Sequence, residues 1–128
     1  MNQHRMVAIV GTRNATDYGR NFCESLVEEL KAYNAYVVSG LAFGIDVCAH
    51  QNAISNEIHN VAVMAHGLDR VYPSEHRKTA GKIIEKGALL TEFPINTNPD
   101  RENFPKRNRI VAGMVDATVV IESAIKGG

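Results

Sequence analysis

The chain has 128 residues, which is enough for one domain with a hydrophobic core and too few for two. Hydrophobic residues make up 45% of it, as in an ordinary soluble domain, and no apolar run approaches the roughly 20 residues that a membrane helix needs. The 14 basic and 14 acidic side chains cancel, so net charge favours no particular partner and any anion site must come from local clusters.

Two features bear on the cellular compartment. The N-terminal apolar run ends at Gly11, is too short for a signal peptide and leads straight into a polar loop. Cys23 and Cys48 both fall on expected helices. The sequence does not exclude a disulfide between them, but it favours two buried free thiols. We therefore expect a cytoplasmic protein that does not associate with membranes.

Five short apolar runs predict strands, and the segments between them predict helices. In chain order we expect strand 7–10, helix 17–33, strand 35–40, helix 44–55, strand 60–67, helix 74–87, strand 88–94, loop 95–105, helix 106–115 and strand 117–123. Strands that are apolar throughout are typical of a parallel sheet buried on both faces. The predicted fold is therefore three-layer, doubly wound α/β, with a mostly parallel sheet and its ligand site at the carboxyl ends of the strands.

The first loop, "GTRNATDYG", matches neither common nucleotide fingerprint. Gly11 and Gly19 have the wrong spacing for a dinucleotide loop, and no Gly-Lys-Ser/Thr follows as in a Walker loop. The loop can still bind phosphate, because Thr12 offers a hydroxyl and Arg13 a bidentate guanidinium near a helix N-terminus. Alternatively, Arg13 is a solvated residue that pairs with Asp17, and the loop alone leaves both interpretations open.

The second loop, "SGLAFGID", joins the second strand to a helix. Gly40 and Gly44 permit tight turns, and Ser39 can donate a hydrogen bond to an anion. Asp46 falls in the first helical turn, where a carboxylate meets the positive end of the helix dipole. The sequence leaves open whether Asp46 only stabilises the helix or also orients Arg13 across the rim.

His66 and His76 are interpreted as solvated or hydrogen-bonded residues and not as metal ligands, and no histidine is interpreted as a catalytic base. His66 and His76 lie in the third loop, "HGLDRVYPSEHR", but their spacing matches no tight ligand pair and no cysteine is near in sequence. His50, one turn into the second helix, is interpreted as a packing residue with a satisfied hydrogen bond. Tyr72 and Pro73 are expected to shape the turn.

The segment "NFPKRNRIVAG" is the most informative. Pro105 suits a first helical turn, so Lys106, Arg107 and Arg109 are expected at the positive end of a helix, against its dipole. Such an unfavourable arrangement indicates function, because an anionic ligand would relieve it. Phe104 can stack on a base or pack against the helix. For at least one cation the alternative is an ion pair, with Glu92, Asp100 or Glu102.

Five segments, in this order and spacing, closely resemble the DprA/Smf family of DNA-processing proteins. They are "GTR", "VVSGLAFGIDVCAH", "GLDRVYPSEHR", "GALLTEFP" and "NFPKRNRIVAG", and together they cover essentially the whole chain. The resemblance implies a Rossmann-like domain that binds single-stranded DNA, protects incoming strands in natural transformation and helps load the RecA recombinase. It further implies a homodimer for the full-length protein, with no established catalytic activity, cofactor or metal.

The resemblance also assigns binding residues to three segments. The DNA- or phosphate-binding residues it implies are Gly11, Thr12, Arg13, Ser39, Gly40, Gly44, Ile45, Asp46, Phe104, Pro105, Lys106, Arg107, Asn108 and Arg109. Phe43 departs from the pattern, because many members carry a basic residue there. The chain also stops at "ESAIKGG", before segments that help form the family's dimer, and lacks the N-terminal helical and C-terminal winged-helix domains of many members. We therefore expect residues 1–128 to be one core domain, truncated at its C-terminus.

The alternative function is enzymatic. Lysine-decarboxylase-like phosphoribohydrolases share a similar sheet and cleave nucleoside monophosphates with a glycine-rich loop and a glutamate. Glu122 followed by Gly127 and Gly128 resembles that pair, but those enzymes place the glutamate after the glycines. A plain NAD-binding domain is disfavoured by the missing fingerprint. The leading hypothesis is single-stranded DNA binding, with Arg13 and one or two of the later cations on phosphates and Phe104 stacked on a base.

Overall fold

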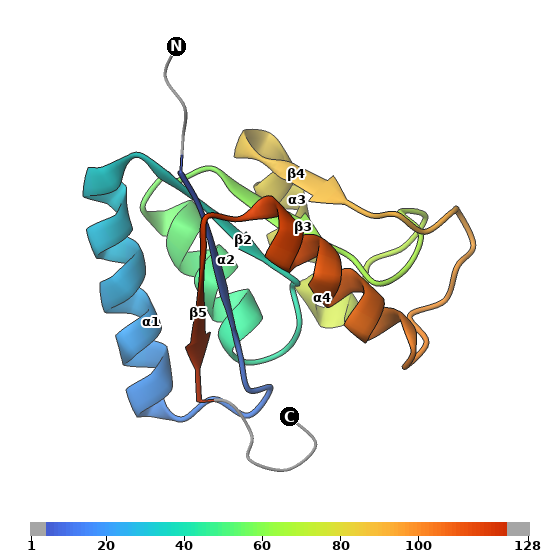
Figure 1. The fold of residues 1–128 in the computed structure, drawn as a ribbon, viewed down its shortest axis with the longest axis horizontal. Helices are drawn as coiled ribbons and strands as arrows, with labels where there is room; N and C mark the ends of the chain where they lie inside the picture. Colours follow the sequence, from blue (N-terminus) through green and yellow to red (C-terminus); the bar gives the residue numbers. More distant parts are fainter. Residues whose placement is uncertain (1–4, 123–128) are drawn as a thin grey trace.

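Five parallel strands form one sheet in the order β4-β3-β2-β1-β5 (Figure 1). The computed structural model describes residues 5–122. The strands are β1 (Arg5–Gly11), β2 (Ala35–Ser39), β3 (Asn60–Val63), β4 (Ala88–Leu90) and β5 (Ala117–Ile121). The helices are α1 (Asp17–Leu30), α2 (Ile45–Ser55), α3 (Arg77–Lys86) and α4 (Asn103–Met114), with 3-10 turns η1 (Lys31–Tyr33) and η2 (Ser74–His76).

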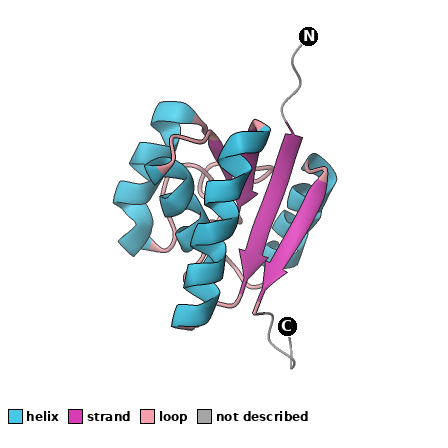
Figure 2. Cartoon of the chain, turned by 90° about the vertical axis from the view of Figure 1, so that its left-hand side faces the viewer, coloured by secondary structure: helices cyan, strands magenta, loops and turns pink. Residues whose placement is uncertain are grey.

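The connections make the sheet doubly wound, as predicted. From β1 to β4 the chain steps in one direction across the sheet through α1, α2 and α3. It then crosses back through α4 and adds β5 beside β1. Helices consequently cover both faces of the sheet (Figure 2). Of these, α4 packs against β1 and β3. All carboxyl ends of the strands meet at one edge, where a ligand site is expected in such folds.

The core lies on both sides of the sheet. Ala8 and Ile9 are neighbours in β1 and point to opposite faces, yet both are fully buried. Ile9 packs in the cluster that includes Cys23 and Cys48 of α1 and α2, whereas Ala8 packs beneath Val111 of α4. In the three central strands two-sided burial explains the apolar runs, whereas the edge strands β4 and β5 leave Leu90 and Val120 exposed. The two cysteines are buried and free, which confirms that prediction.

Several predicted boundaries were wrong. The strands expected to reach residues 67 and 94 end at Val63 and Leu90. Beyond them the Thr91 hydroxyl donates to the Met64 and His66 carbonyls at 3.3 and 2.8 Å, so a side chain takes over from the sheet ladder. Ser74, the expected cap of the third helix, lies instead in η2 and its hydroxyl contacts Glu75.

The fourth helix begins earlier than predicted, at Asn103 and not at residue 106. The Asn103 amide nitrogen donates to the Asp100 carbonyl at 2.9 Å, and its side chain donates to the Asn98 carbonyl at 2.9 Å. Pro105 is the third residue of this helix, where its missing N–H is still tolerated. The shift moves Lys106, and the cations after it, beyond the first turn.

Candidate functional site

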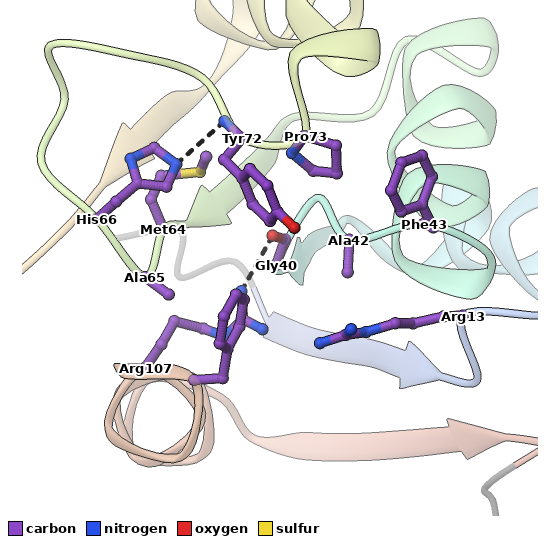
Figure 3. Close-up of a pocket in the computed structure, with 11 residues that line it drawn as sticks. Arg13, Gly40, Ala42, Phe43, Met64, Ala65, His66, Tyr72, Pro73 and Arg107 are labelled. Carbon is purple, nitrogen blue, oxygen red and sulfur yellow. Dashed lines mark hydrogen bonds between the residues drawn. The ribbon is translucent and has the colours of Figure 1, made fainter. Parts of the chain in front are cut away.

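A pocket lies at the carboxyl edge of the sheet, between the loops that follow β1, β2 and β3 and the start of α4 (Figure 3). Aromatic rings, two guanidinium groups and small or apolar side chains form its lining. The lining residues are Arg13, Gly40, Ala42, Phe43, Met64, Ala65, His66, Tyr72, Pro73, Phe104 and Arg107. The structure therefore brings together Arg13, Gly40, Phe104 and Arg107 from three segments that the sequence had singled out.

Arg13 reaches across the pocket mouth to Phe104. Its guanidinium carbon lies 5.5 Å from the centroid of the Phe104 ring, a cation–π arrangement, while the side chain stays exposed. The alternative pairing with Asp17 is not formed, because Arg20 holds that carboxylate at 2.5 Å, three residues along α1. Arg13 thus keeps its donors available to an anion at the mouth of the pocket.

Two glycines allow the first and second loops to pack against each other. Gly44 has φ +78, and a Cβ there would lie 2.2 Å from the Thr12 carbonyl oxygen. The Ile45 amide nitrogen donates to that same carbonyl at 3.1 Å. A Cβ on Gly11 would similarly lie 2.1 Å from the Ile121 carbonyl oxygen. None of these five residues lines the pocket; they fix the loop from which Arg13 projects.

Ser39 and Asp46 are buried and do not face the pocket. The Ser39 hydroxyl donates to the Ile9 carbonyl at 2.6 Å, which ties β2 to β1. An Asp46 carboxylate oxygen accepts from the Gly40 amide at 3.1 Å. Burial raises the pKa of Asp46, and the nearby positive charge of Arg107 opposes that rise. Asp46 therefore interacts electrostatically with Arg107, whereas the sequence had left open an interaction with Arg13.

Arg107 builds the pocket from beneath. Its side chain is buried, and Nη1 donates to the carbonyls of Gly40 and Val63, each at 3.0 Å. Nε donates to the Asn108 side-chain oxygen at 2.8 Å, and the guanidinium carbon lies 5.5 Å from the Phe104 centroid. Arg107 thus joins the ends of β2 and β3 and supports the ring over which Arg13 lies.

Lys106 and Arg109 are exposed and lie outside the pocket. Because α4 begins at Asn103, neither belongs to its first turn, and the predicted conflict with the helix dipole was wrong. Within residues 5–122 the basic partners of the ion pairs are Arg20, Arg70 and Lys86. The alternative ion pairs for the α4 cations, with Glu92, Asp100 or Glu102, are therefore not formed.

Sequence reasoning missed part of the third loop as pocket lining. The Tyr72 amide donates to His66 Nε2 at 3.2 Å, and His66 Nδ1 donates to the Gly67 carbonyl at 2.7 Å. These bonds confirm that His66 is a hydrogen-bonded residue. The bond from the Tyr72 amide also holds Tyr72 at the pocket. The available signal was the position of "YP" after the third strand, at the same edge as the other loops. Met64 carried no signal beyond its place at that strand end.

His50 and His76 also serve packing. His76 Nδ1 donates to the Leu41 carbonyl at 2.7 Å, as the hydrogen-bonded interpretation predicted. His50 Nδ1 pairs with the Asn60 side-chain oxygen at 2.8 Å, and burial lowers the pKa of His50 to about 4. In the described part of the chain, no three His, Cys, Asp or Glu side chains gather as a metal site. Nor is any helix there long and apolar enough to cross a membrane.

Glu122, the glutamate of the enzymatic alternative, lies at the cap of α1 and not at the pocket. One carboxylate oxygen accepts from the Thr16 amide at 2.9 Å, and the other accepts from the Thr16 hydroxyl. Thr16 Oγ1 in turn accepts from the Gly19 amide at 3.1 Å and caps the helix. These bonds commit both oxygens to structure. Gly127 and Gly128 of that alternative lie outside the described residues.

Replacing Glu122 with glutamine is expected to lower stability at neutral pH and to weaken its dependence on acidic pH. The Thr16 hydrogen bonds hold the pKa of Glu122 below its usual 4.5. The ionised carboxylate therefore stabilises the fold above pH 4.5, and this contribution is lost as pH falls through the lowered pKa. Urea unfolding at a series of pH values from 7 to about 3 measures this contribution to the free energy of unfolding. Glu24→Gln, on the exposed side of α1, controls for losing one carboxylate. Parallel stability curves for the parent and Glu122→Gln would contradict the prediction.

The family model described as DNA recombination-mediator protein A matches residues 1–128. The chain belongs to this family. A curated member, Protein Smf of a Synechocystis strain, is 40% identical over 122 residues, which are 95% of this chain and 31% of that protein. The family resemblance noted from the five sequence segments is thereby confirmed.

Solved structures of DNA recombination-mediator protein A relatives share the fold. The DNA processing protein A of Streptococcus pneumoniae superposes with a TM-score of 0.87 at 32% identity, covering 96% of this chain and 43% of that one. That of Helicobacter pylori, whose single-stranded DNA binding mode is described as unique, gives 0.88 at 31%, covering 96% and 56%. The chain thus carries the Rossmann-like DNA-processing fold and spans about a third of its Synechocystis relative.

Proposed function

We propose that this domain binds single-stranded DNA across the pocket, with a phosphate on Arg13 and a base on Phe104. The observation that carries the proposal is the exposed Arg13 guanidinium placed 5.5 Å from the Phe104 ring at the pocket mouth. A guanidinium fork matches phosphate oxygens, and an aromatic ring stacks on any base. The single-stranded DNA binding of the Helicobacter pylori relative supports this assignment.

The remaining predicted residues divide into two roles in this proposal. Exposed Lys106, Asn108 and Arg109 on α4 contact phosphates of the strand where it leaves the pocket. The other residues hold the loops and the pocket floor in place. They are Gly11, Thr12, Ser39, Gly40, Gly44, Ile45, Asp46, Pro105 and Arg107. Few cations reach the strand, so affinity is modest and depends strongly on salt.

The chain covers 31% of the Synechocystis relative and 43% of the Bacillus subtilis one, so the biological role is proposed for a protein that contains this domain. We propose that it is cytoplasmic, protects incoming single strands in natural transformation, helps load RecA and acts as a homodimer. Its action on DNA is binding without catalysis, which agrees with the structural engagement of Glu122.

Binding to matched single- and double-stranded oligonucleotides, followed by fluorescence anisotropy, tests the function. We expect single strands to bind more tightly, with log affinity falling linearly with log salt at about −0.7 per phosphate contact. Phe104→Ala is expected to weaken single-strand binding by about 1–3 kcal/mol, because one stacked base is lost. Phe22→Ala, an exposed ring on α1 outside the pocket, is the control. Equal affinity for both forms of DNA, unchanged by Phe104→Ala, would refute the proposal.

A further inference from the structure

The pocket has two unlike sides. In Figure 3, Tyr72, Pro73 and Phe43 lie along one side, and Arg13 and Arg107 lie along the other. None of the lining residues is acidic. Arg107 is buried and its Nη1 is bonded to two carbonyls, so Arg13 is the exposed cation among the lining residues. The side opposite Arg13 consists of the rings of Tyr72, Pro73 and Phe43 and carries no charge.

Phe43 is an exposed ring at this uncharged side. It retains 40% of its accessible surface, although large apolar side chains are normally buried when the fold allows it. The ring contacts His76 edge-on, with the two ring centroids 5.0 Å apart at an interplanar angle of 68°. An edge contact of this kind supports the ring while leaving aromatic surface open to a ligand.

The loop that carries Phe43 is held from several directions. Leu41 is fully buried with φ 60, an unusual backbone conformation for a residue with a side chain, and its carbonyl accepts from His76 Nδ1 at 2.7 Å. Gly40 is bound through its amide by Asp46 and through its carbonyl by Arg107. The exposed ring is consequently presented on a fixed backbone, which lowers the ordering cost of binding.

We infer that Phe43 is a base-stacking residue of the pocket, taking a base of the same strand whose phosphate lies on Arg13. The inference rests on the proposed function and adds a second stacking position to that of Phe104. A phenyl ring has neither a positive charge nor a hydrogen-bond donor for a phosphate, whereas every base has a π-face on which the ring can stack. Phe43 thereby adds affinity that does not depend on salt, because no counterion is released when a base stacks.

Single-stranded oligonucleotides that carry one 2-aminopurine at successive positions test this inference. In the parent protein, stacking on Phe43 quenches the probe at a defined position. Phe43→Ala is expected to remove that quenching and to weaken binding by about 5- to 150-fold, with an unchanged salt slope. Phe43→Tyr keeps the ring and is expected to stay within about twofold. Phe22→Ala is again the control for an exposed ring outside the pocket.

The outcomes separate the inference from the proposed function. If the parent binds and Phe104→Ala weakens binding while Phe43→Ala does not, only the role of Phe43 is refuted. An affinity loss with a changed salt slope also refutes it, since that indicates a lost phosphate contact. If the parent does not bind single strands, the proposed function itself fails. Should Phe43→Ala unfold, Phe43→Leu keeps apolar volume without a π-face and must still lose the quenching.

Discussion

Replacing Arg13 with alanine is expected to weaken single-stranded DNA binding by about 10- to 150-fold, the value of a hydrogen-bonded charge. The guanidinium is exposed, so its loss removes little from the core, and the free energy of unfolding should change by less than about 0.5 kcal/mol. The salt slope should also fall by about 0.7, because one phosphate contact disappears. A large effect on binding with almost none on stability is the signature of a residue that touches the ligand.

Salt titration of oligonucleotide binding measures both quantities. Arg13→Lys keeps the charge but loses the planar fork, so we expect it to preserve the salt slope and recover only part of the affinity. Arg5→Ala is the matched control: Arg5 is exposed at the amino end of β1, opposite the pocket edge. If Arg13→Ala and Arg5→Ala bind equally well with equal slopes, the phosphate site lies elsewhere.

Replacing Arg107 with alanine is expected to lower the free energy of unfolding by about 3–5 kcal/mol, the usual cost of leaving a buried charge uncompensated. The carbonyls of Gly40 and Val63 lose their donor, and the buried Asp46 loses the positive charge near it. Arg107→Lys should recover little, because an ammonium lacks the planar fork. Arg109→Ala, on the exposed side of the same helix, should stay within about 0.5 kcal/mol.

The loss of unfolding free energy in Arg107→Ala, here called the deficit, should depend on pH, and this dependence identifies its cause. Burial already raises the pKa of Asp46 above its usual 3.8, and removing Arg107 raises it further. A group whose pKa is raised by folding takes up a proton more readily when folded, so its destabilising effect lessens as pH falls. The deficit should therefore shrink in acid, and Asp46→Asn should reduce it at neutral pH. A deficit below about 1 kcal/mol would show that these bonds contribute little.

The sheet could be predicted because the apolar pattern within each strand segment is visible in the sequence alone. The central strands are apolar on successive residues, as Ala8 and Ile9 illustrate, and that pattern requires cover on both faces. The ends of β3 and β4 could not be predicted, because the ladder stops where the Thr91 side chain takes over the carbonyls of a distant loop. The start of α4 was missed for a similar reason: bonds to residues 98 and 100 decide it.

Which α4 cations are buried was not decided from the sequence, although the helical spacing of the segment could have shown it. Asn103, Arg107 and Val111 are four residues apart, and all three are buried on one face of α4. Had the helix start been known, the apolar Val111 would have placed Arg107 inside the protein and left Lys106 and Arg109 outside. The electrostatic interaction of Asp46 with Arg107 has no such signal, because it joins α2 and α4, which are far apart in the sequence and are brought together only by the fold.

In the proposed function, the hydrogen bonds at Gly40 have a consequence for which single strands the pocket binds. Asp46 holds the Gly40 amide, Arg107 holds its carbonyl, and Arg107 in turn supports Phe104. A site held by these bonds has little conformational freedom, so the bound strand must change its conformation to fit the site. Thymine-rich strands, which stack weakly on themselves, can follow a rigid surface at small cost, whereas adenine-rich strands must first unstack. A base-composition preference can thus arise without any hydrogen bond that reads a base.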